Sequence, residues 1–431
     1  MNRPPVVVLD DDPTGAQAQA GVPVLLDWQP QLLADASAEG PPAVHLLTNT
    51  RAVPPAEAEA TTFVAARAAR DSFPGSPVIL RGDSTLRAHL VPEYEGLRRA
   101  LHPAAAPPLM LVPALPSAGR VTEGGVHYLL RDGARVPVGE TEYATDPDFS
   151  FRSSRLLDWA EERSGGVFVA TAGREISAAE LRQSGGAAVA TALAELSAAG
   201  EAAALVVDAS DDEDLALAAR GLRGAEAAGT PVIVRSAPAF VGVFAGSAAH
   251  GFVPAPAGDG PVLVVCGSHV PATTRQLECL AAREPDNLVW ARTERLAGAD
   301  AEQEIAAVAD RAAERLGSGR TTVVATTREV LGTSGRLELG ARVASGLAAV
   351  LARLRSLAGV VVSKGGITSA VNLREGMASA VAHVVGPLRP GISLWRVDTP
   401  ERRAVPFVVF PGNVGGDADL ADLVAAIGGA A

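Results

Sequence analysis

The sequence predicts an α/β protein of two domains, each built on a mostly parallel sheet that helices flank. Short β-branched runs alternate with longer Ala-, Leu- and Glu-rich stretches of helical period. With 431 residues, the chain is long for one domain. The segment Gly246–Gly260 is rich in Gly, Ala and Pro, which is typical of a linker. We therefore expect an N-terminal domain over residues 1–245, a linker over 246–260 and a C-terminal domain over 261–431.

The predicted elements follow this alternation through both domains. The strands expected in the first domain are Val6–Leu9, Val44–Thr48, Val78–Arg81, Leu109–Val112, Val167–Ala170, Ala204–Val207 and Val232–Val234. The helices expected there are Ala56–Arg70, Glu93–Leu101, Ala178–Ala198 and Glu213–Ala228. Thr122–Asp146 breaks the rhythm and is predicted to form a hairpin excursion over the sheet. The strands expected in the second domain are Val262–Cys266, Thr322–Ala325, Val360–Ser363, Ile392–Trp395 and Phe407–Phe410, with helices near Thr274–Arg283, Ala301–Leu316 and Glu338–Leu357.

Composition excludes several classes of protein. The formal net charge is −12, which argues against general binding of a nucleic-acid backbone, because that affinity rests on Lys and Arg. The two cysteines, Cys266 and Cys279, lack metal-ligand spacing and fit a reducing compartment. The first apolar run, Val6–Leu9, is too short for a signal-peptide core, and no run reaches membrane-spanning length. We expect a cytoplasmic protein without nucleic-acid or membrane partners.

An acidic turn follows the first predicted strand, with the sequence Asp10-Asp11-Asp12-Pro13-Thr14-Gly15. Three adjacent carboxylates repel one another and usually need a metal, a basic partner or open water. The turn could hold Mg²⁺ or take a proton from a substrate hydroxyl. It could also be a solvated turn in which one Asp caps the next helix. We favour the functional interpretation, because a plain turn rarely needs three acids and a Thr-Gly pair.

A second polar segment, Arg81-Gly82-Asp83-Ser84-Thr85-Leu86-Arg87, also follows a predicted strand. The planar fork of Arg binds carboxylates, and Asp83 and Ser84 can read sugar hydroxyls. A helix cap flanked by surface arginines explains this segment equally well. Arg51 follows the neighbouring strand and would add a cation at the same sheet edge, although alone it is an ordinary loop residue. His127 is interpreted as a structural histidine.

Three glycine loops follow strands of the second domain. They are Gly267-Ser268, Lys364-Gly365-Gly366-Ile367-Thr368-Ser369 and Pro411-Gly412-Asn413-Val414-Gly415-Gly416-Asp417. Glycines let the backbone approach phosphates, and helix N-termini offer free N–H donors. Neither a P-loop nor a Gly-x-Gly-x-x-Gly fingerprint is present. Lys364 has the right chemistry for phosphate contact, or it is a surface residue at a strand end. Three such loops in one domain favour a nucleotide site.

Together these motifs resemble the four-carbon acid sugar kinase family over nearly the whole chain. The resemblance rests on Asp11-Asp12-Pro13-Thr14-Gly15 and Asp83-Ser84-Thr85-Leu86-Arg87 in the first domain. In the second domain it rests on Gly267-Ser268, Gly365-Gly366-Ile367-Thr368 and the loop Pro411–Gly416. It implies ATP-dependent phosphorylation of the terminal hydroxyl of a four-carbon sugar acid, such as a threonate, erythronate or oxo-tetronate. The active site would lie in the cleft between the two domains.

The resemblance also implies roles for individual residues. Asp12 or Asp11 would act as the catalytic base, and the metal ligands for Mg²⁺ stay unassigned. Substrate binding would fall to Asp11, Arg51, Arg81, Asp83 and Ser84. ATP binding would fall to Ser268, Gly365, Gly366, Thr368, Ser369, Gly412, Asn413, Gly415 and Gly416. The expected partner is a small sugar acid, with a homodimer as a further option.

The chain departs from the family pattern at four places. Ile367 stands where Asp is usual, Asp10 adds a third acid, and Pro13 replaces an aromatic residue. The last loop has Gly412-Asn413-Val414-Gly415-Gly416 instead of the more common Gly-Gly-Phe-Gly. These differences bear on the substrate more than on phosphoryl transfer.

Two other functions are compatible with parts of the sequence. Asp10-x-Asp12-x-Thr14 matches the nucleophile motif of haloacid dehalogenase-type phosphatases, in which Asp10 would form an aspartyl-phosphate. Thr48, Lys364 and Asp417 could then serve as later motifs, but this interpretation explains neither Arg81–Arg87 nor Gly267-Ser268. A non-catalytic sugar-acid sensor on a kinase-like scaffold is favoured by Ile367 alone.

Overall fold

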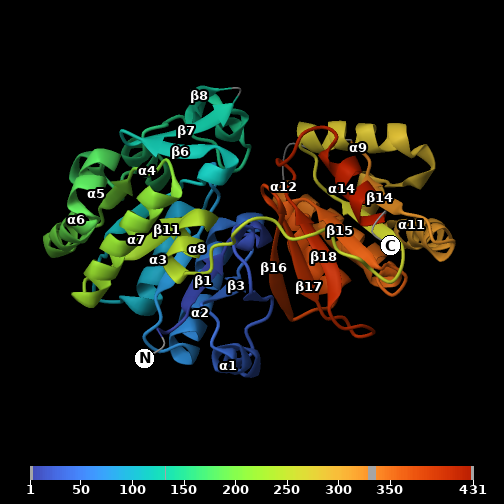
Figure 1. The fold of residues 1–431 in the computed structure, drawn as a ribbon, viewed down its shortest axis with the longest axis horizontal. Coiled ribbons are helices and arrows are strands. Elements are labelled where there is room, and N and C mark those ends of the chain that lie inside the picture. The colour runs from blue at the N-terminus through green and yellow to red at the C-terminus, as the bar shows by residue number, and fades with distance from the viewer. Residues whose placement is uncertain (1–2, 132, 329–335, 429–431) are drawn as a thin grey trace. The chain divides into compact units, whose positions relative to one another are not determined.

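The computed structural model describes residues 3–131, 133–328 and 336–428. The chain divides into two compact units (Figure 1). The first contains the residues up to Asp11 together with Trp28–Ala248, and the second contains Asp12–Asp27 together with the residues from Ala249 onward. The early segment Asp12–Asp27 therefore packs with the C-terminal half of the chain. The acidic turn is divided between the units, because the chain passes from one to the other between Asp11 and Asp12.

The first unit has a parallel sheet with the strand order β3-β1-β4-β11-β5-β10-β9. Its strands are β1 (Val6–Asp10), β3 (Ala43–Leu47), β4 (Val78–Arg81), β5 (Leu109–Val112), β9 (Arg174–Ile176), β10 (Ala204–Val207) and β11 (Ile233–Ser236). The register aligns Leu47, Asp10, Arg81, Ser236 and Val112 across neighbouring strands. The carboxyl ends of five strands therefore form one row, where ligands of open α/β sheets bind.

Two rows of helices flank this sheet (Figure 1). One row contains α1 (Pro30–Glu39), α2 (Pro55–Ser72), α3 (Leu90–Leu101) and α4 (Leu156–Ser164). The other row contains α5 (Ala178–Ser184), α6 (Ala187–Ala199), α7 (Asp212–Ala227) and α8 (Pro238–Ala245). The predicted helix Ala178–Ala198 is two helices, because Gly185 and Gly186 both take left-handed backbone angles between α5 and α6.

The predicted strand Val167–Ala170 is wrong. Gly165 and Gly166 both take left-handed backbone angles before it, and the following residues leave α4 as a bend. Only Phe168 is buried, edge-on against Tyr94, while the valines on either side are 42% and 43% exposed. The apolar run is thus a single hydrophobic anchor, and the edge strand is β9, a few residues further on.

The predicted excursion over Thr122–Asp146 is confirmed as a small antiparallel sheet. Its strands are β6 (Arg120–Glu123), β7 (Val126–Arg131) and β8 (Ala134–Pro137). The carboxylate of Asp208, which follows β10, accepts hydrogen bonds from the backbone N–H groups of Gly124 (2.7 Å) and Gly125 (2.9 Å). Those bonds tie the β6–β7 turn to the carboxyl edge of the main sheet.

The second unit has the strand order β13-β14-β12-β15-β18-β17-β16-β2. Its strands are β2 (Val22–Leu25), β12 (Val262–Cys266), β13 (Leu288–Ala291), β14 (Thr322–Thr326), β15 (Val360–Lys364), β16 (Val381–Arg389), β17 (Ile392–Val397) and β18 (Val405–Phe410). The pairs from β13 to β18 are parallel, and β17, β16 and β2 add antiparallel pairs. The strand β2 was not predicted, because its partner β16 lies near the other end of the sequence.

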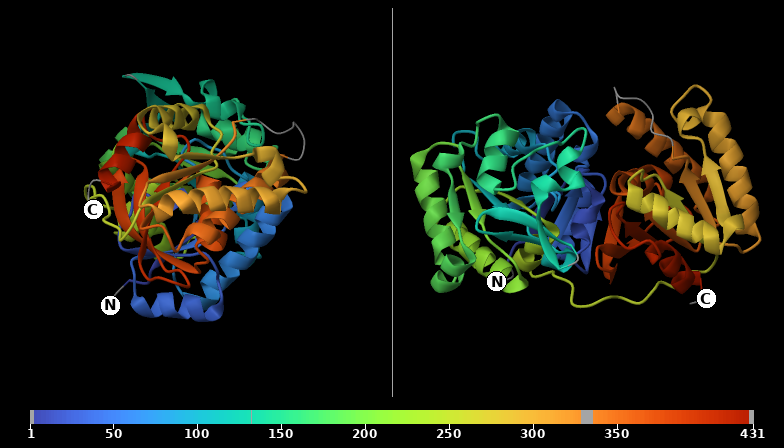
Figure 2. Two further views of the ribbon diagram at one scale, coloured as in Figure 1. Left: turned by 90° about the vertical axis from the view of Figure 1, so that its right-hand side faces the viewer. Right: turned by 90° about the horizontal axis from the view of Figure 1, so that it is seen from above.

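The helices of the second unit pack against this sheet (Figure 2). They are α9 (Pro271–Arg283), α10 (Thr293–Leu296), α11 (Ala301–Gly317), α12 (Arg336–Leu354), α13 (Gly366–Val371) and α14 (Asp419–Gly428), and a π-helical turn Asn372–Gly376 follows α13. One hydrophobic cluster joins β12, β15 and β18 to α9 and α14. Among the described residues, no helix is long and apolar enough to cross a membrane.

Candidate active site

Asp10 is a buried structural anchor at the end of β1. Its Oδ2 lies 2.7 Å from His45 Nδ1, and its Oδ1 accepts a hydrogen bond from Arg81 Nε. Burial alone would raise the pKa of Asp10, but Arg81 and His45 outweigh it and hold that pKa below its ordinary value. Since both oxygens are engaged and the side chain is fully buried, Asp10 is badly placed for the nucleophilic attack that a phosphatase would need.

Asp11 lies among three arginines. Its carboxylate oxygens are 3.2 Å from Arg81 Nη1, 3.6 Å from Arg51 Nη2 and 3.7 Å from Arg235 Nη2. Neither oxygen has a hydrogen-bond partner among the described residues. Burial raises the pKa of Asp11 above its ordinary value, more than the arginines lower it. A buried carboxylate with charged neighbours and unused lone pairs can accept a hydrogen bond from a ligand hydroxyl.

Asp83 orders the loop that follows β4. It accepts hydrogen bonds from Thr85 Oγ1 and from Arg87 Nε (2.6 Å), and Arg51 Nη1 lies 3.5 Å away. Burial raises its pKa, but Arg87 and Arg51 outweigh that effect and hold the pKa well below its ordinary value. The backbone carbonyl of Ser84 accepts a hydrogen bond from His127 Nε2 (2.8 Å). His127 therefore links β7 to this loop, in agreement with its predicted structural role.

Arg235, at the end of β11, was missed by the sequence analysis. Its Nη1 donates to Glu93 Oε2, and Glu93 Oε1 accepts from Thr50 Oγ1 at 2.5 Å. A Cβ at Gly82 would overlap the Arg235 guanidinium, so the glycine makes room for it. The signal was present, because Arg235 follows an apolar run of three residues as Arg81 does, although Ser236 is the residue in register with Arg81. The pairing with Glu93 could not be read from sequence.

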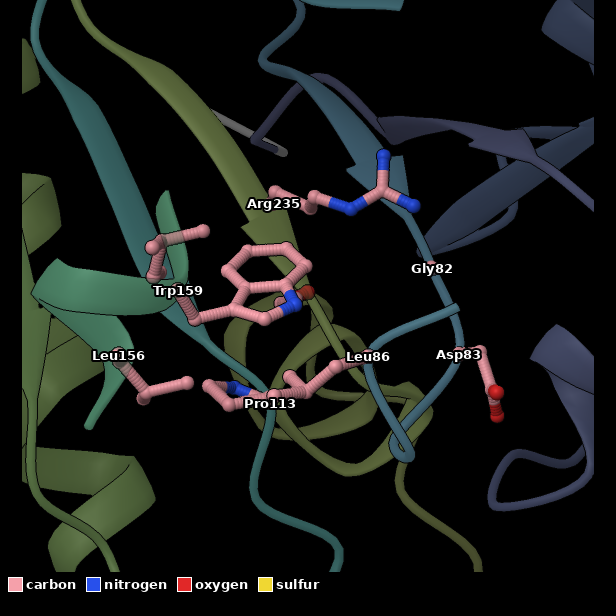
Figure 3. A pocket seen from close by; sticks show the side chains of 9 residues that line it. Gly82, Asp83, Leu86, Pro113, Leu156, Trp159 and Arg235 are labelled. Atoms are coloured by element: carbon pink, nitrogen blue, oxygen red, sulfur yellow. The ribbon is translucent and has the colours of Figure 1, made fainter. Parts of the chain in front are cut away.

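A small cavity of about 20 Å³ lies beside this cluster (Figure 3). It lies where β4, β11 and β5 end and is closed by α4. Its lining residues are Gly82, Asp83, Leu86, Leu111, Pro113, Leu156, Trp159, Arg235 and Ser236. It therefore borders one predicted substrate-binding segment, the loop after β4, through Asp83.

Asp12 lies in the second unit, beside the nucleotide loops. It caps the 3₁₀ turn Pro13–Ala16, accepting from the backbone N–H of Thr14 (2.8 Å) and from the Thr14 hydroxyl. A Cβ added at Gly366 would come within 2.8 Å of Asp12 Oδ2. The expected base is therefore in direct contact with the start of α13, where the sequence predicted a phosphate-binding loop.

The three glycine loops of the second unit meet one another. The Ser268 side chain packs so closely on Gly412 that a Cβ there would overlap it, and it also lies against Gly365. Thr368 Oγ1 would be 2.5 Å from a Cβ at Gly267 and 3.0 Å from one at Gly365. Gly365 has a φ of 122°, which favours glycine. The loops that the sequence predicted separately thus form one cluster, in which glycine is required for close packing.

The Pro411–Gly416 loop is held by its carbonyl groups. Lys364 Nζ donates to the carbonyl of Pro411 at 2.6 Å and contacts those of Gly412 and Val414 at 3.5 and 3.4 Å. Gln276 Nε2 lies 3.0–3.2 Å from the carbonyls of Val414, Gly415 and Gly416. Because a trans peptide points its N–H opposite to its C=O, the following N–H groups point away from Lys364 and Gln276. The N–H of Gly416 already donates to Asp419 Oδ2 at 2.8 Å, so the N–H groups of Gly412, Asn413 and Gly415 are the ones that suit an anion on the outer side of the loop.

Lys364 is the single lysine of the chain and is fully buried. Burial lowers its pKa to about 7, and the ammonium lies 3.7 Å from the centre of the Phe410 ring. It is therefore neither the surface lysine nor the direct phosphate contact that the sequence suggested, but a support beneath the loop. Ser369 is also turned inward, donating to the Gly365 carbonyl at 2.7 Å.

A metal site is not evident from the protein groups alone. In the described parts of the chain, no three His, Cys, Asp or Glu side chains gather as ligands. Mg²⁺ at phosphoryl-transfer sites is usually held by one or two carboxylates together with phosphate oxygens and water, so a full protein cage is not required. Asp12, beside the glycine loops, is a carboxylate that fits such a role.

Family models match both units. The sugar-binding N-terminal domain matches residues 6–244, and the nucleotide-binding C-terminal domain matches residues 263–420. This chain belongs to the four-carbon acid sugar kinase family. The family is one of ATP-dependent sugar-acid kinases, in line with the fold and the two kinds of site described above.

Two curated relatives carry kinase names. The D-threonate kinase of Salmonella typhimurium is 27% identical over 391 residues, covering 87% of this chain and 86% of that protein. The D-erythronate kinase of Heliobacterium modesticaldum is 33% identical over 159 residues, covering 36% of this chain and 35% of that protein. The two relatives are named for different acids.

Solved structures share the fold. A protein of Salmonella typhimurium LT2 has a TM-score of 0.68 at 20% identity, covering 96% of this chain and 98% of that one. A protein of Haemophilus influenzae has a TM-score of 0.61 at 17% identity, covering 97% of this chain and 99% of that one. At these identities the likeness concerns the fold alone.

Proposed function

We propose that this protein uses ATP to phosphorylate the terminal hydroxyl of a four-carbon sugar acid of the threonate, erythronate or oxo-tetronate type. The observation that carries the proposal is the division of the acidic turn. Asp11 lies among the arginines of the sugar-binding unit, while Asp12 contacts Gly366 of the nucleotide-binding unit. A single peptide bond joins the two carboxylate-bearing residues.

Asp12 is the proposed catalytic base, and Asp11 orients the acceptor. Asp12 takes the proton of the attacking hydroxyl, and the unused oxygens of Asp11 accept hydrogen bonds from substrate hydroxyls. Phosphoryl transfer depends mostly on positioning and charge stabilisation, so no covalent nucleophile is needed. The proposed substrate site is completed by residues that hold Asp11 and the loop after β4 in place. These residues are Arg51, Arg81, Asp83 and Ser84.

ATP would be held by the clustered glycine loops. The proposed contacts are the backbone and hydroxyl groups of Ser268, Gly365, Gly366, Thr368, Gly412, Asn413, Gly415 and Gly416, with Ser369 supporting them from within. Mg²⁺, when bound, would supply neutralising charge for the phosphates and would be held largely by phosphate oxygens and water. We also propose a cytoplasmic location, which cell fractionation would test. A homodimer is proposed as well, and light scattering would test it.

The two alternative functions fit the geometry less well. A phosphatase that uses Asp10 needs a free carboxylate oxygen, whereas both oxygens of Asp10 are engaged by His45 and Arg81. A sensor without catalysis is favoured only by Ile367, which is 38% exposed where the family usually has Asp. The phosphatase interpretation also gives no role to the position of Asp12 against Gly366.

The test is a coupled assay with purified protein, ATP and Mg²⁺ against D-threonate, D-erythronate, L-threonate and their 2- and 3-oxo counterparts. We expect ADP to form in proportion to a phosphorylated acid with at least one substrate. Free phosphate released without a phosphorylated acid would favour a phosphatase or simple ATP hydrolysis. ATP binding without turnover across the panel would favour the sensor.

A further inference from the structure

Glu93 is a buried carboxylate of α3 that lies beside the proposed substrate site. It is only 3% exposed. Its Oε2 accepts a hydrogen bond from Arg235 Nη1, and its Oε1 accepts one from Thr50 Oγ1. Thr50 precedes Arg51, and both Arg51 and Arg235 lie within 4 Å of the Asp11 carboxylate. Glu93 therefore joins two segments that carry cations to Asp11, the end of β11 and the turn after β3.

The position of Glu93 is fixed by α3. Glu93 lies in the first turn of this helix, where a negative side chain is favourable, and its N–H donates to the His89 carbonyl at 3.1 Å. Three residues later, Gly96 packs so closely on α2 that an added Cβ would come within 2.6 Å of the Glu59 carbonyl. The carboxylate of Glu93 is thus presented by a helix that is tightly packed on its neighbour.

Arg235 reaches Asp11 from the opposite face of the sheet to Arg81. The register pairs Ser236 with Arg81 and Arg235 with Leu80, and successive side chains of a strand point to opposite faces. Asp11 lies one residue beyond β1, where both guanidinium groups reach it. Its Oδ1 is 3.2 Å from Arg81 Nη1, and its Oδ2 is 3.7 Å from Arg235 Nη2.

Each of the three arginines near Asp11 also faces a second carboxylate. The pairs are Arg81 with Asp10, Arg51 with Asp83, and Arg235 with Glu93. Neither oxygen of Asp11 has a hydrogen-bond partner in the part of the chain that the structure describes, and neither has Arg235 Nη2. Asp11 is therefore surrounded by positive charge while its lone pairs stay open.

Glu93 and Asp11 compete for the same guanidinium. Within the described residues, they are the two carboxylates that lie within 4 Å of Arg235. Arginine readily places two N–H groups on one carboxylate. A movement of about 1 Å would bring Arg235 Nη2 into hydrogen-bond range of Asp11 Oδ2. The charge on Glu93 is what opposes that movement.

We propose that Glu93 is a positioning residue of the substrate site, which holds Arg235 off Asp11 so that the Asp11 carboxylate stays open to a substrate hydroxyl. This inference rests on the proposed function, in which Asp11 orients the acceptor. When Arg235 occupies Oδ2, the substrate must displace it, so the apparent affinity falls in proportion to the fraction of molecules in which Asp11 is open. The effect concerns the sugar acid, since the ATP loops lie in the second unit.

E93Q tests the geometry without any ligand, because it removes the charge and keeps the shape of the side chain. Crystal structures of the ligand-free wild type and of E93Q measure the separation between Arg235 Nη2 and Asp11 Oδ2. We expect it to shorten from 3.7 Å to about 2.9 Å in the variant, an ordinary N–H···O distance. An unchanged separation overturns the inference.

Steady-state kinetics with ATP and either D-threonate or D-erythronate test the consequence. If Asp11 is open in about one molecule in ten of E93Q, KM for the acid rises about tenfold. We expect kcat and KM for ATP to change less than about threefold, because Arg235 has left Asp11 once the acid is bound. A fall in kcat at unchanged acid KM would indicate a merely structural role. The control is E59Q, since Glu59 forms a more exposed pair with Arg99 of the same helix.

A double variant separates positioning from damage to the fold. E93Q/R235Q removes the restrained cation together with its restraint, and replacing both partners of a buried pair is tolerated better than removing one. We expect KM for the acid to fall at least about threefold relative to E93Q, whereas independent structural defects would add. A KM at or above that of E93Q overturns the inference. If E93Q does not fold, E93D keeps the charge and shortens the side chain by one methylene; an acid KM equal to that of the wild type then counts against the inference.

The outcomes distinguish this inference from the proposed function. If the wild type phosphorylates an acid and E93Q does so with the same KM, the inference fails and the kinase proposal stands. If Arg235 closes on Asp11 in E93Q but the wild type phosphorylates neither acid, the kinase proposal fails for these acids and the restraint of Arg235 by Glu93 stands.

Discussion

The carboxylate of Asp12 lies against Gly366, where a Cβ would come within 2.8 Å of Oδ2. Both residues belong to the second unit, although they are at opposite ends of the sequence. The contact exists because Asp12–Asp27 packs with the C-terminal half of the chain and adds β2 to its sheet. It connects Asp12 of the acidic turn to the nucleotide loops within the second unit.

G366A tests this contact. The added methyl group must displace the Asp12 carboxylate, and we expect kcat to fall at least tenfold with little change in thermal stability. Steady-state kinetics and a melting curve measure both. G317A is the matched control, because Gly317 ends α11 and a Cβ there meets nothing within 4 Å. Equal activity in both variants would argue against a catalytic role for the Asp12–Gly366 contact.

D12N should nearly abolish turnover. Asn keeps the size and can still accept a hydrogen bond from Thr14 N, but it cannot take a proton. General-base catalysis contributes roughly 10²- to 10⁴-fold, and we expect a loss of kcat in that range. D310N, at an exposed position on α11, is the control. A D12N enzyme with near-normal kcat would remove Asp12 from the mechanism.

K364M should weaken ATP binding more than sugar-acid binding. Removing the amine leaves the carbonyls of the Pro411–Gly416 loop without their central donor. We expect KM for ATP to rise about tenfold or more, as for a lost buried charged hydrogen bond, and KM for the acid to change less than threefold. R275M is the control, since Arg275 forms an exposed pair with Asp417 beside the same loop. Parallel rises in both KM values would contradict the assignment.

D10N should lower the free energy of unfolding. Asp10 is buried between His45 and Arg81, and neutralising it leaves the Arg81 charge poorly compensated. Breaking a buried ion pair on one side costs about 3–5 kcal/mol of unfolding free energy. Denaturant unfolding would measure this loss. A stable D10N protein that retains kinase activity would show that Asp10 matters less to the fold than its contacts indicate. Detection of a stable aspartyl-phosphate at Asp10 in the wild-type protein would instead support the phosphatase hypothesis.

Because His127 is buried, we expect the free energy of unfolding to depend on pH. Burial lowers its pKa from 6.5 to about 4, so the folded protein keeps the ring neutral where the unfolded chain binds a proton. The contribution of this residue is complete above pH 6.5 and is lost as the pH falls toward 4. The loss amounts to about 3 kcal/mol at most, at 1.36 kcal/mol for each unit of pKa. H127N should have a flatter unfolding free energy between pH 6.5 and 4, and identical slopes would refute the assignment.

Local patterns were sufficient to predict most of the elements and the location of the loops. Apolar runs such as Val78–Arg81 and Val262–Cys266 became strands with the predicted bounds, because a buried parallel strand requires a continuous apolar run. The Gly-rich segments follow strands because close packing of Ser268 on Gly412 and of Thr368 on Gly267 excludes a Cβ. The strand preference acts over a few residues and is therefore visible in the sequence, whereas the packing that requires these glycines joins residues more than 100 positions apart.

By itself, the sequence determined the α/β class, the strand-end position of the polar motifs and the resemblance to a sugar-acid kinase. Tertiary structure alone decided which carboxylate is a buried anchor, which lies among arginines and which contacts a glycine loop. It also decided that Arg235 pairs with Glu93, that Lys364 lies beneath a loop and that Trp159 closes a cavity. The physical reason is that hydrogen bonding and burial depend on partners that are distant in the chain, whereas strand and turn preferences depend on neighbours.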